Sequence, residues 1–165
     1  MYLLDANVFI QAKNLHYGFD FCPAFWDWLS EAHSRGSVFS IDKVRDEILA
    51  GDDELSAWAA PLPATFFLKP DAAVLTSLQV TSRWAIGAGY EPAAVSTFLQ
   101  VGDSYLVAHG HALGWTVVSH EVVSAGMKKI KIPNACIALG VRCVTPYEML
   151  RAERARFVLP TSGVR

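Results

Sequence analysis

Short apolar runs alternate with longer amphipathic stretches along this chain. The runs predict strands over residues 2–5, 37–40, 115–119 and 141–144, with an edge strand over residues 65–68. The stretches between them show the 3.6-residue apolar repeat of helices. This alternation predicts an α/β sandwich with a central, mainly parallel sheet.

Capping residues set the expected ends of the helices. Pro23 suits the first position of a helix, and Asp42 could cap another. Thr145 and Pro146 make an Ncap and N1 pair for the last helix. Helices are expected over residues 23–36, 42–50, 54–60, 71–86, 91–100, 102–114 and 147–157.

The composition is that of one compact domain. A chain of 165 residues buries about 70% of the surface that its unfolded form exposes, so a core is available without disulfides. Apolar residues make up 52% and charged residues 18%, which argues against disorder and for a compact protein that could self-associate. We expect a single domain over residues 1–158 and a tail over residues 159–165.

Several other classes of protein are disfavoured. No apolar run approaches the roughly 20 residues that span a bilayer, so we expect no membrane association and a cytoplasmic location. The three cysteines lack CxxC spacing and are odd in number, which argues against a zinc ribbon and a disulfide framework. The net charge of −2 gives no general attraction to nucleic acid, so any phosphate binding must be local.

Four acidic residues lie at the edges of predicted core elements. Asp5 and Glu121 each follow a strand. Asp103 begins the helix that leads to the strand of Glu121, and Glu47 lies within the helix over residues 42–50. Ligands of parallel α/β folds bind outside the carboxyl ends of the strands. The predicted fold therefore brings three of the four acids, Asp5, Asp103 and Glu121, toward one crevice.

A cluster of carboxylates needs a compensating cation. Two carboxylates about 4 Å apart repel by roughly 4 kcal/mol at an effective dielectric constant near 20, so a cluster without a cation has raised pKa values. Oxygen-only ligation suits Mg²⁺ or Mn²⁺, which can bridge to a substrate phosphate. The acids therefore predict metal-dependent cleavage of phosphodiester bonds.

Four motifs along the chain support the same interpretation. They are Leu3-Leu4-Asp5-Ala6-Asn7-Val8-Phe9, Val44-Arg45-Asp46-Glu47-Ile48, Asp103-Ser104-Tyr105-Leu106-Val107-Ala108 and Val117-Val118-Ser119-His120-Glu121. A fifth segment, Lys131-Ile132-Pro133-Asn134-Ala135-Cys136, follows them. In this order and spacing they resemble the PIN domain, and most closely its VapC-like toxin branch. The resemblance implies a PIN-like three-layer sandwich.

The resemblance also implies roles for the acids. Asp5, Glu47 and Asp103 correspond to the acids that ligate or orient the metal ion. Glu121 has the fourth acidic position, where many members have Asp, so direct and water-mediated coordination both stay open. The family's usual activity is endoribonuclease hydrolysis by metal-activated water, which leaves 5′-phosphate and 3′-hydroxyl ends. The implied protein is the toxin of a toxin–antitoxin pair, with an RNA substrate, a cognate antitoxin protein and a homodimeric assembly.

Polar and basic residues near the acids could assist them. By the resemblance, Asn7 orients a ligand or a bound water and Ser119 forms a hydrogen bond into the pocket. A plain cap and a strand-end hydroxyl are the structural alternatives. Lys128, Lys129 and Lys131 could hold RNA phosphates, or they could form a solvated loop.

The acids have structural alternatives as well. Asp5 could cap a turn after the first strand, and Asp103 could complement the dipole of its helix. Glu47 has acidic neighbours such as Asp46, and a helix with several acids is often only a solvated face.

Two other functions stay open at this point. One is a noncatalytic PIN-like module that binds RNA or protein. The other is a phosphatase with an aspartate nucleophile after the first strand, although Asn7 stands where such enzymes need a second acid.

Overall fold

Within residues 1–158, five strands form one parallel sheet. A computed structural model describes this range, and the predicted tail over residues 159–165 lies outside it. The strands are β1 (Tyr2–Leu4), β2 (Val38–Ile41), β3 (Phe67–Leu68), β4 (Thr116–Val118) and β5 (Cys143–Val144). Their order is β3-β2-β1-β4-β5, and every neighbouring pair is parallel. The predicted α/β class, the parallel sheet and the edge position of β3 are confirmed.

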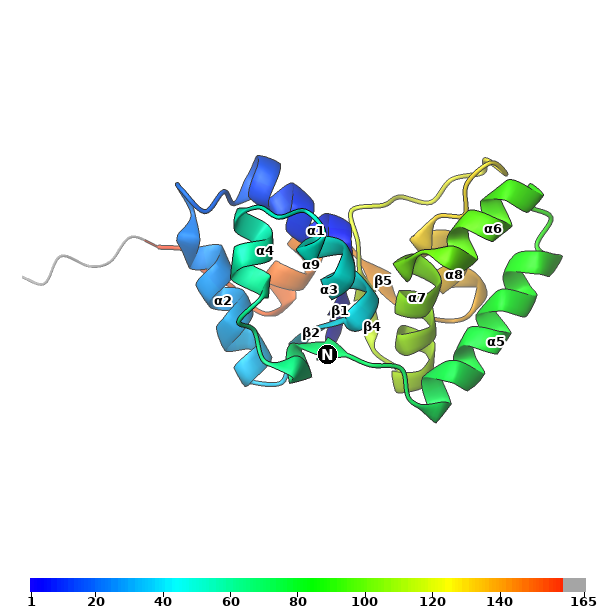
Figure 1. Cartoon of the computed structure of the whole chain (residues 1–165), viewed down its shortest axis with the longest axis horizontal. Helices are drawn as coiled ribbons and strands as arrows, with labels where there is room; N and C mark the ends of the chain where they lie inside the picture. Colours follow the sequence, from blue (N-terminus) through cyan, green and yellow to red (C-terminus); the bar gives the residue numbers. More distant parts are fainter. Residues whose placement is uncertain (159–165) are drawn as a thin grey trace, which may run out of the picture.

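Helices cover both faces of the sheet. They are α1 (Ala6–Gln11), α2 (Pro23–Ser34), α3 (Asp42–Leu49), α4 (Glu54–Ala59), α5 (Ala72–Gly87), α6 (Pro92–Gln100), α7 (Gly102–Leu113), α8 (Ile132–Ala138) and α9 (Pro146–Ala152). A π-helical segment, η1 (Ala12–His16), continues α1, and a 3-10 turn, η2 (Ala64–Phe66), precedes β3. Figure 1 shows α2, α4 and α9 on one side of the sheet and α5 to α8 on the other. None of the helices within residues 1–158 is long and apolar enough to cross a bilayer.

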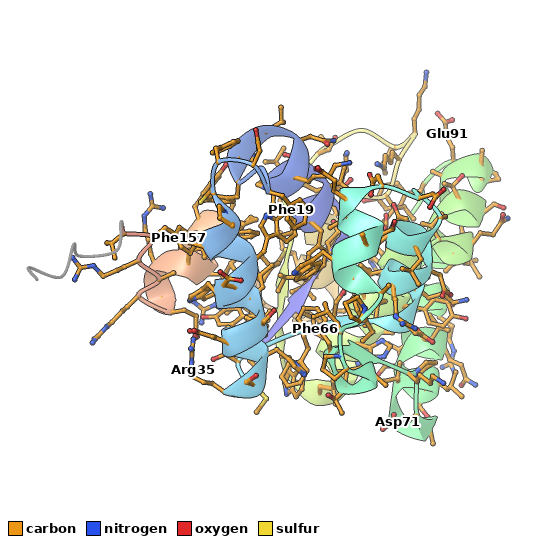
Figure 2. The ribbon with its side chains drawn as sticks, turned by 60° about the vertical axis from the view of Figure 1, so that its left-hand side comes forward. Phe19, Arg35, Phe66, Asp71, Glu91 and Phe157 are labelled. Atoms are coloured by element: carbon orange, nitrogen blue, oxygen red, sulfur yellow. The ribbon has the colours of Figure 1, made fainter. Side chains whose placement is uncertain are left out.

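Aromatic side chains fill the core between the sheet and the layer of α2 and α4. The rings of Phe9 and Trp58 lie 5.8 Å apart between centroids, and those of Trp26 and Trp58 lie 4.9 Å apart. Phe66 packs edge-on against Trp58. In Figure 2, Phe66 lies among the side chains of the interior, whereas Arg35 lies at the periphery. Burial of these rings fixes the first layer of helices against β1 and β2.

Helix α7 approaches the sheet closely because Gly110 has no side chain. A Cβ atom at this position would lie 2.8 Å from Cγ2 of Val117 and 2.9 Å from Cγ1 of Val141. Real Cβ atoms do not tolerate such contacts, so a glycine is required here.

The helix predictions need correction at three places. Helix α1 begins directly after β1, where the sequence predicts only a turn, and α8 is not predicted from the sequence. Helix α9 ends at Ala152 and does not reach residue 157, because Arg154 adopts a φ of +55°. The Ala155 N–H then donates to the Leu150 carbonyl at 2.9 Å, which closes the helix end.

The capping predictions are mostly confirmed. Thr145 and Glu148 form a capping box at the start of α9, and Pro146 occupies the first turn. Pro23 likewise opens α2. Asp42 lies in the first turn of α3 and is not its cap, which is Ile41.

Candidate active site

The four predicted acids line one cavity at the carboxyl edge of the sheet. Asp5 follows β1 and Glu121 follows β4, while Asp103 lies in the first turn of α7 and Glu47 in α3. The cavity has a volume of about 150 Å³ and is also lined by Ala6, Asn7, Ile10, Lys129 and Ile132. Residues that are up to 116 positions apart are thus brought to one site, since position 5 and position 121 share its wall.

Asp5 is the buried centre of this cavity. Leu3 and Leu4 of β1 are fully buried, and Asp5, which follows them, is only 5% exposed. Its side chain makes no capping hydrogen bond to α1 within the described residues, so the structure does not support the alternative of a turn cap. Burial, and to a smaller degree the charge of the nearby Asp103, raise the pKa of Asp5 to about 7.

Ser119 connects three parts of the site through its hydroxyl group. Its Oγ donates to Oδ2 of Asp5 at 2.9 Å. The same Oγ accepts hydrogen bonds from Nδ2 of Asn7 at 3.2 Å and from the Glu121 N–H at 3.1 Å. One donated and two accepted bonds use the full capacity of a hydroxyl group, so the orientation of Asp5 is fixed.

Asn7 links the acid cavity to the residue after Ser119. Its Oδ1 accepts a hydrogen bond from the His120 N–H at 3.1 Å. Both ends of the amide are therefore held by the segment that follows β4. This geometry is compatible with the supporting role predicted for Asn7. Asn7 is not a plain helix cap, because it lies within α1.

Asp103 and Glu47 face the same cavity from α7 and α3. Asp103 is half-buried, and burial together with the charges of Glu121 and Glu47 raises its pKa to about 6. Glu47 is exposed at the rim, where partial burial of its carboxylate raises its pKa. Its neighbours Val44 and Ile48 are buried, so Glu47 lies beside the helix face that packs on the domain. The expectation of raised pKa values is met at these two acids and at Asp5.

Glu121 behaves differently because cations and a backbone N–H surround it. Its Oε1 accepts from Nζ of Lys129 at 3.1 Å and from Nζ of Lys131 at 3.0 Å, and its Oε2 accepts from the Ile132 N–H at 2.8 Å. Burial alone would raise its pKa, but these three donors hold it below its ordinary value. The expectation of a raised pKa is wrong here.

The basic residues divide between two cavities. Lys129 lines the acid cavity, and Lys131 reaches it through its bond to Glu121. Lys128 lies outside it and lines a neighbouring cavity of about 190 Å³ that also touches Asp103. The sequence does not predict the Ile132 N–H as part of the site. Pro133 nevertheless indicates the start of α8, where this N–H lies.

The donor set fits a divalent cation held by few protein ligands. No group of three or more His, Cys, Asp or Glu side chains within residues 1–158 is arranged so that it could enclose a metal ion. The carboxylates of Asp5 and Asp103 nevertheless repel each other, and neither forms an ion pair with a Lys or Arg side chain within residues 1–158. Mg²⁺ commonly uses one or two carboxylates, with water and substrate phosphate as further ligands. The pair suits such a site, with Glu47 at its rim.

A comparison with protein families identifies the family of this chain. The model of a domain of unknown function, DUF4411, matches residues 2–157. The chain belongs to this family. No curated protein matches the DUF4411 chain.

Two solved structures share the architecture of this DUF4411 domain. FitAcB from Neisseria gonorrhoeae is 20% identical, with a TM-score of 0.55 over 89% of this chain and 99% of that chain. FitAB bound to an IR36 DNA fragment is 19% identical, with a TM-score of 0.54 over 89% of this chain and 96% of that chain. Identities this low establish the fold alone. The predicted PIN-like three-layer sandwich is confirmed.

Proposed function

We propose that this DUF4411 domain is a Mg²⁺- or Mn²⁺-dependent endoribonuclease that hydrolyses RNA phosphodiester bonds. The observation that carries the proposal is the buried Asp5 carboxylate, which shares one cavity with Asp103 and Glu47. Buried charges are retained in proteins when they are paired or when they coordinate a metal ion. An oxygen-only site at the carboxyl edge of a parallel sheet is suited to an ion that also contacts phosphate.

Three acids of the cavity and the neighbouring Ser119 have a part in this activity. Asp5 and Asp103 would hold the cation, with Glu47 reaching it from the rim. Such an ion, when bound, polarises phosphoryl oxygens and lowers the pKa of water. Ser119 keeps the Asp5 carboxylate in one orientation through its hydrogen bond.

The lysines provide positive charge for the RNA backbone. Lys129 and Lys131 share the single carboxylate of Glu121, so one positive charge is left over at the cavity wall. Glu121 thereby acts as the anchor of the two lysines, and we propose that it does not ligate the ion directly. The lysines bind the phosphate that is cut, and Lys128 contacts an adjoining one.

We further propose that the domain is the toxin of a toxin–antitoxin pair. The toxin role is proposed from the VapC-like motifs, and the fold shared with FitAcB and FitAB supports it. A cognate antitoxin protein is the proposed partner and a homodimer the proposed assembly. Expression of the chain without a partner should arrest growth of the host cell, and Asp103→Asn should relieve the arrest.

Two isosteric variants test the nuclease. Purified wild type, Asp5→Asn and Asp103→Asn are incubated with a panel of RNAs and Mg²⁺ or Mn²⁺, and Asp46→Asn serves as a control because this exposed acid of α3 does not line the cavity. We expect both cavity variants to lose cleavage while their circular dichroism is retained, and the control to cut normally. Undiminished cleavage by both cavity variants rejects the proposal.

A noncatalytic RNA-binding module is the second candidate. It is favoured by the ion pairs that compensate the charge of Glu121 and by the lack of a three-ligand group within residues 1–158. This candidate predicts that RNA binds but that no metal-dependent product forms at any ratio of protein to RNA.

A further inference from the structure

Three ring side chains from distant parts of the chain meet beside the acid cavity. His16 ends η1, His120 lies between Ser119 and Glu121, and Tyr147 lies in the first turn of α9. The ring centroids lie 5.3 Å apart for His16 and His120, and 5.7 Å apart for each of these histidines and Tyr147. The Tyr147 hydroxyl lies 3.1 Å from Nε2 of His16. These contacts hold the three rings as one cluster, the ring cluster.

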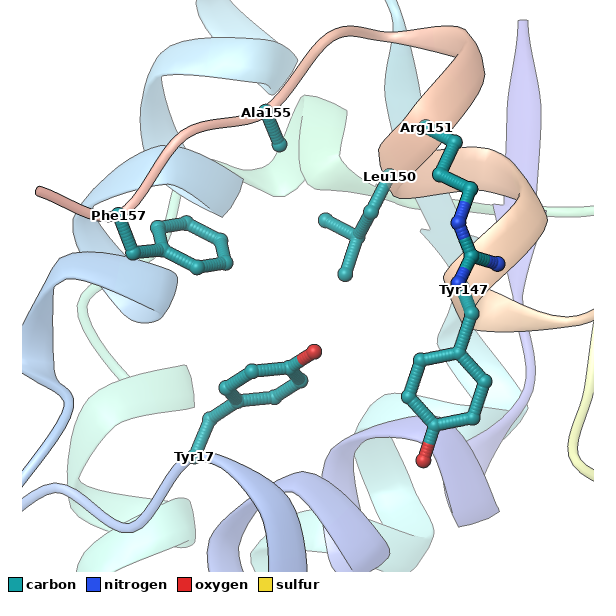
Figure 3. A pocket seen from close by; sticks show the side chains of 6 residues that line it. All are labelled: Tyr17, Tyr147, Leu150, Arg151, Ala155 and Phe157. Atoms are coloured by element: carbon teal, nitrogen blue, oxygen red, sulfur yellow. The ribbon is translucent and has the colours of Figure 1, made fainter.

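A cavity adjoins the ring cluster and shares Tyr147 with it. It has a volume of about 230 Å³ and is lined by Tyr17, Tyr147, Leu150, Arg151, Ala155 and Phe157 (Figure 3). Figure 3 shows the rings of Tyr17, Tyr147 and Phe157 around the opening, with the Tyr17 hydroxyl directed into the space between them. Stacking of Tyr17 on Phe25, with centroids 4.3 Å apart, fixes the Tyr17 ring before any ligand binds.

The charge of this cavity is opposite to that of the acid cavity. No acidic residue of the described chain lines it, and Arg151 is its charged side chain. Arg151 is exposed and forms no ion pair with a carboxylate within residues 1–158. Its guanidinium group is therefore available to an anionic or a planar ligand.

The ring cluster is connected to the acid cavity by short covalent and hydrogen-bonded links. The His120 N–H donates to Asn7, which lines the acid cavity. The residue before His120 is Ser119, whose hydroxyl holds Asp5. The ring cluster is therefore joined to the acid cavity through His120 and to the cavity of Arg151 through Tyr147.

We infer that the ring cluster and the cavity of Tyr17, Arg151 and Phe157 form a subsite for a nucleotide adjacent to the one whose phosphate is cut. This inference rests on the proposed ribonuclease function. Bases of single-stranded RNA stack on Tyr, Phe and His rings, and Arg binds phosphate or stacks on a base. The subsite supplies attraction for RNA that the net charge of −2 does not provide.

The subsite determines which segment of an RNA is presented for cleavage. Stacking requires an unpaired base, because a base within a duplex has no free face. The subsite therefore selects single-stranded RNA and acts on binding, whereas the acids act on the chemical step.

Binding is measured without cleavage in an Asp103→Asn background. Fluorescence anisotropy with a labelled single-stranded RNA is compared for this protein and for the same protein carrying Tyr147→Ala or Arg151→Gln. Arg154→Gln is the matched control, because this exposed arginine lies just beyond the end of α9 and does not line the cavity. We expect each subsite change to weaken binding at least about fivefold, the lower end of one base–aromatic stack, and the control to change it less than about twofold.

A scan of abasic nucleotides shows whether a base is the ligand. Removal of the base at one position of the RNA should weaken its binding to the Asp103→Asn protein. In the protein that also carries Tyr147→Ala, the RNAs with and without that base should bind equally well. In the cleaving protein, Tyr147→Ala should raise KM with little change in kcat.

The outcomes separate this inference from the function on which it rests. If the wild type cleaves RNA but Tyr147→Ala and Arg151→Gln bind it as Arg154→Gln does, the subsite is rejected and the nuclease stands. In that case the surface would be left to a protein partner. A wild type that neither binds nor cleaves any RNA in the panel overturns both.

Discussion

Replacement of Asp5 by Asn should stabilise the metal-free protein above neutral pH. The pKa of Asp5 is about 7 in the folded protein, against an ordinary value of 3.8, because the carboxylate is buried near Asp103. Between these two pH values the folded state binds the proton and the unfolded state does not. The free energy of unfolding therefore falls as the pH rises through this window. Above it, the whole penalty of the buried charge acts on the folded state.

The size of the penalty follows from the two pKa values. Their difference corresponds to roughly 4 kcal/mol at full ionisation. Asn has the shape of Asp and can still accept the hydrogen bond from Ser119, but its NH₂ group must be desolvated, which offsets part of the gain. Since 1 kcal/mol shifts the melting temperature of a chain of this size by about 2–4 °C, we expect a rise of about 5 °C or more at pH 8.

Thermal unfolding followed by circular dichroism in EDTA measures the effect. Wild type, Asp5→Asn and the exposed control Asp46→Asn are compared at pH 5 and pH 8. The gain of Asp5→Asn should be clearly larger at pH 8 than at pH 5, and the control should differ little between the two. A variant that melts below the wild type at pH 8, or gains equally at both pH values, would refute the account of Asp5 as an uncompensated buried charge.

Three further predictions follow from the same contacts. Mg²⁺ or Mn²⁺ should raise the melting temperature of the wild type more at pH 8 than at pH 5, and should not do so for Asp5→Asn; equal shifts in both proteins would place the ion elsewhere. Ser119→Ala should lower the free energy of unfolding by about 1–3 kcal/mol in urea titrations. Because the Ser119 hydrogen bond lowers the pKa of Asp5, this variant should also move the acidic limb of the pH–activity profile to higher pH. Gly110→Ala should cost about 1–3 kcal/mol, since its Cβ would meet Val117, and an unchanged urea midpoint would contradict the close packing of α7.

The strands and the strongly capped helices could be predicted from sequence because their signals are local. Apolar runs identified the strands, and the Thr145 and Pro146 pair identified the start of α9. Helix α1 has only six residues and follows β1 directly, so its start at Asp5-Ala6-Asn7 resembles a turn. The early end of α9 depends on a left-handed conformation at Arg154, a residue type that gives no sign of it.

The site could be predicted only as far as strand ends specify it. Asp5 and Glu121 line one cavity because the carboxyl edge of a parallel sheet collects strand-end residues, and Asp103 joins them from the start of α7. The anchoring of Glu121 depends on lysines 8 and 10 positions later in an irregular segment, where no periodicity relates them. The ring cluster combines residues from three separate elements, so its members become neighbours only in the folded chain.

End-group analysis of RNA tests the proposed hydrolysis at a metal-dependent acidic site. The most direct measurement is end-group analysis of RNA incubated with the purified, partner-free protein, with Mg²⁺ or Mn²⁺ and with excess EDTA. We expect products with 5′-phosphate and 3′-hydroxyl ends in the presence of metal and intact RNA in EDTA. Cleavage that persists in EDTA, or products that end in a 2′,3′-cyclic phosphate, would contradict the proposed hydrolysis.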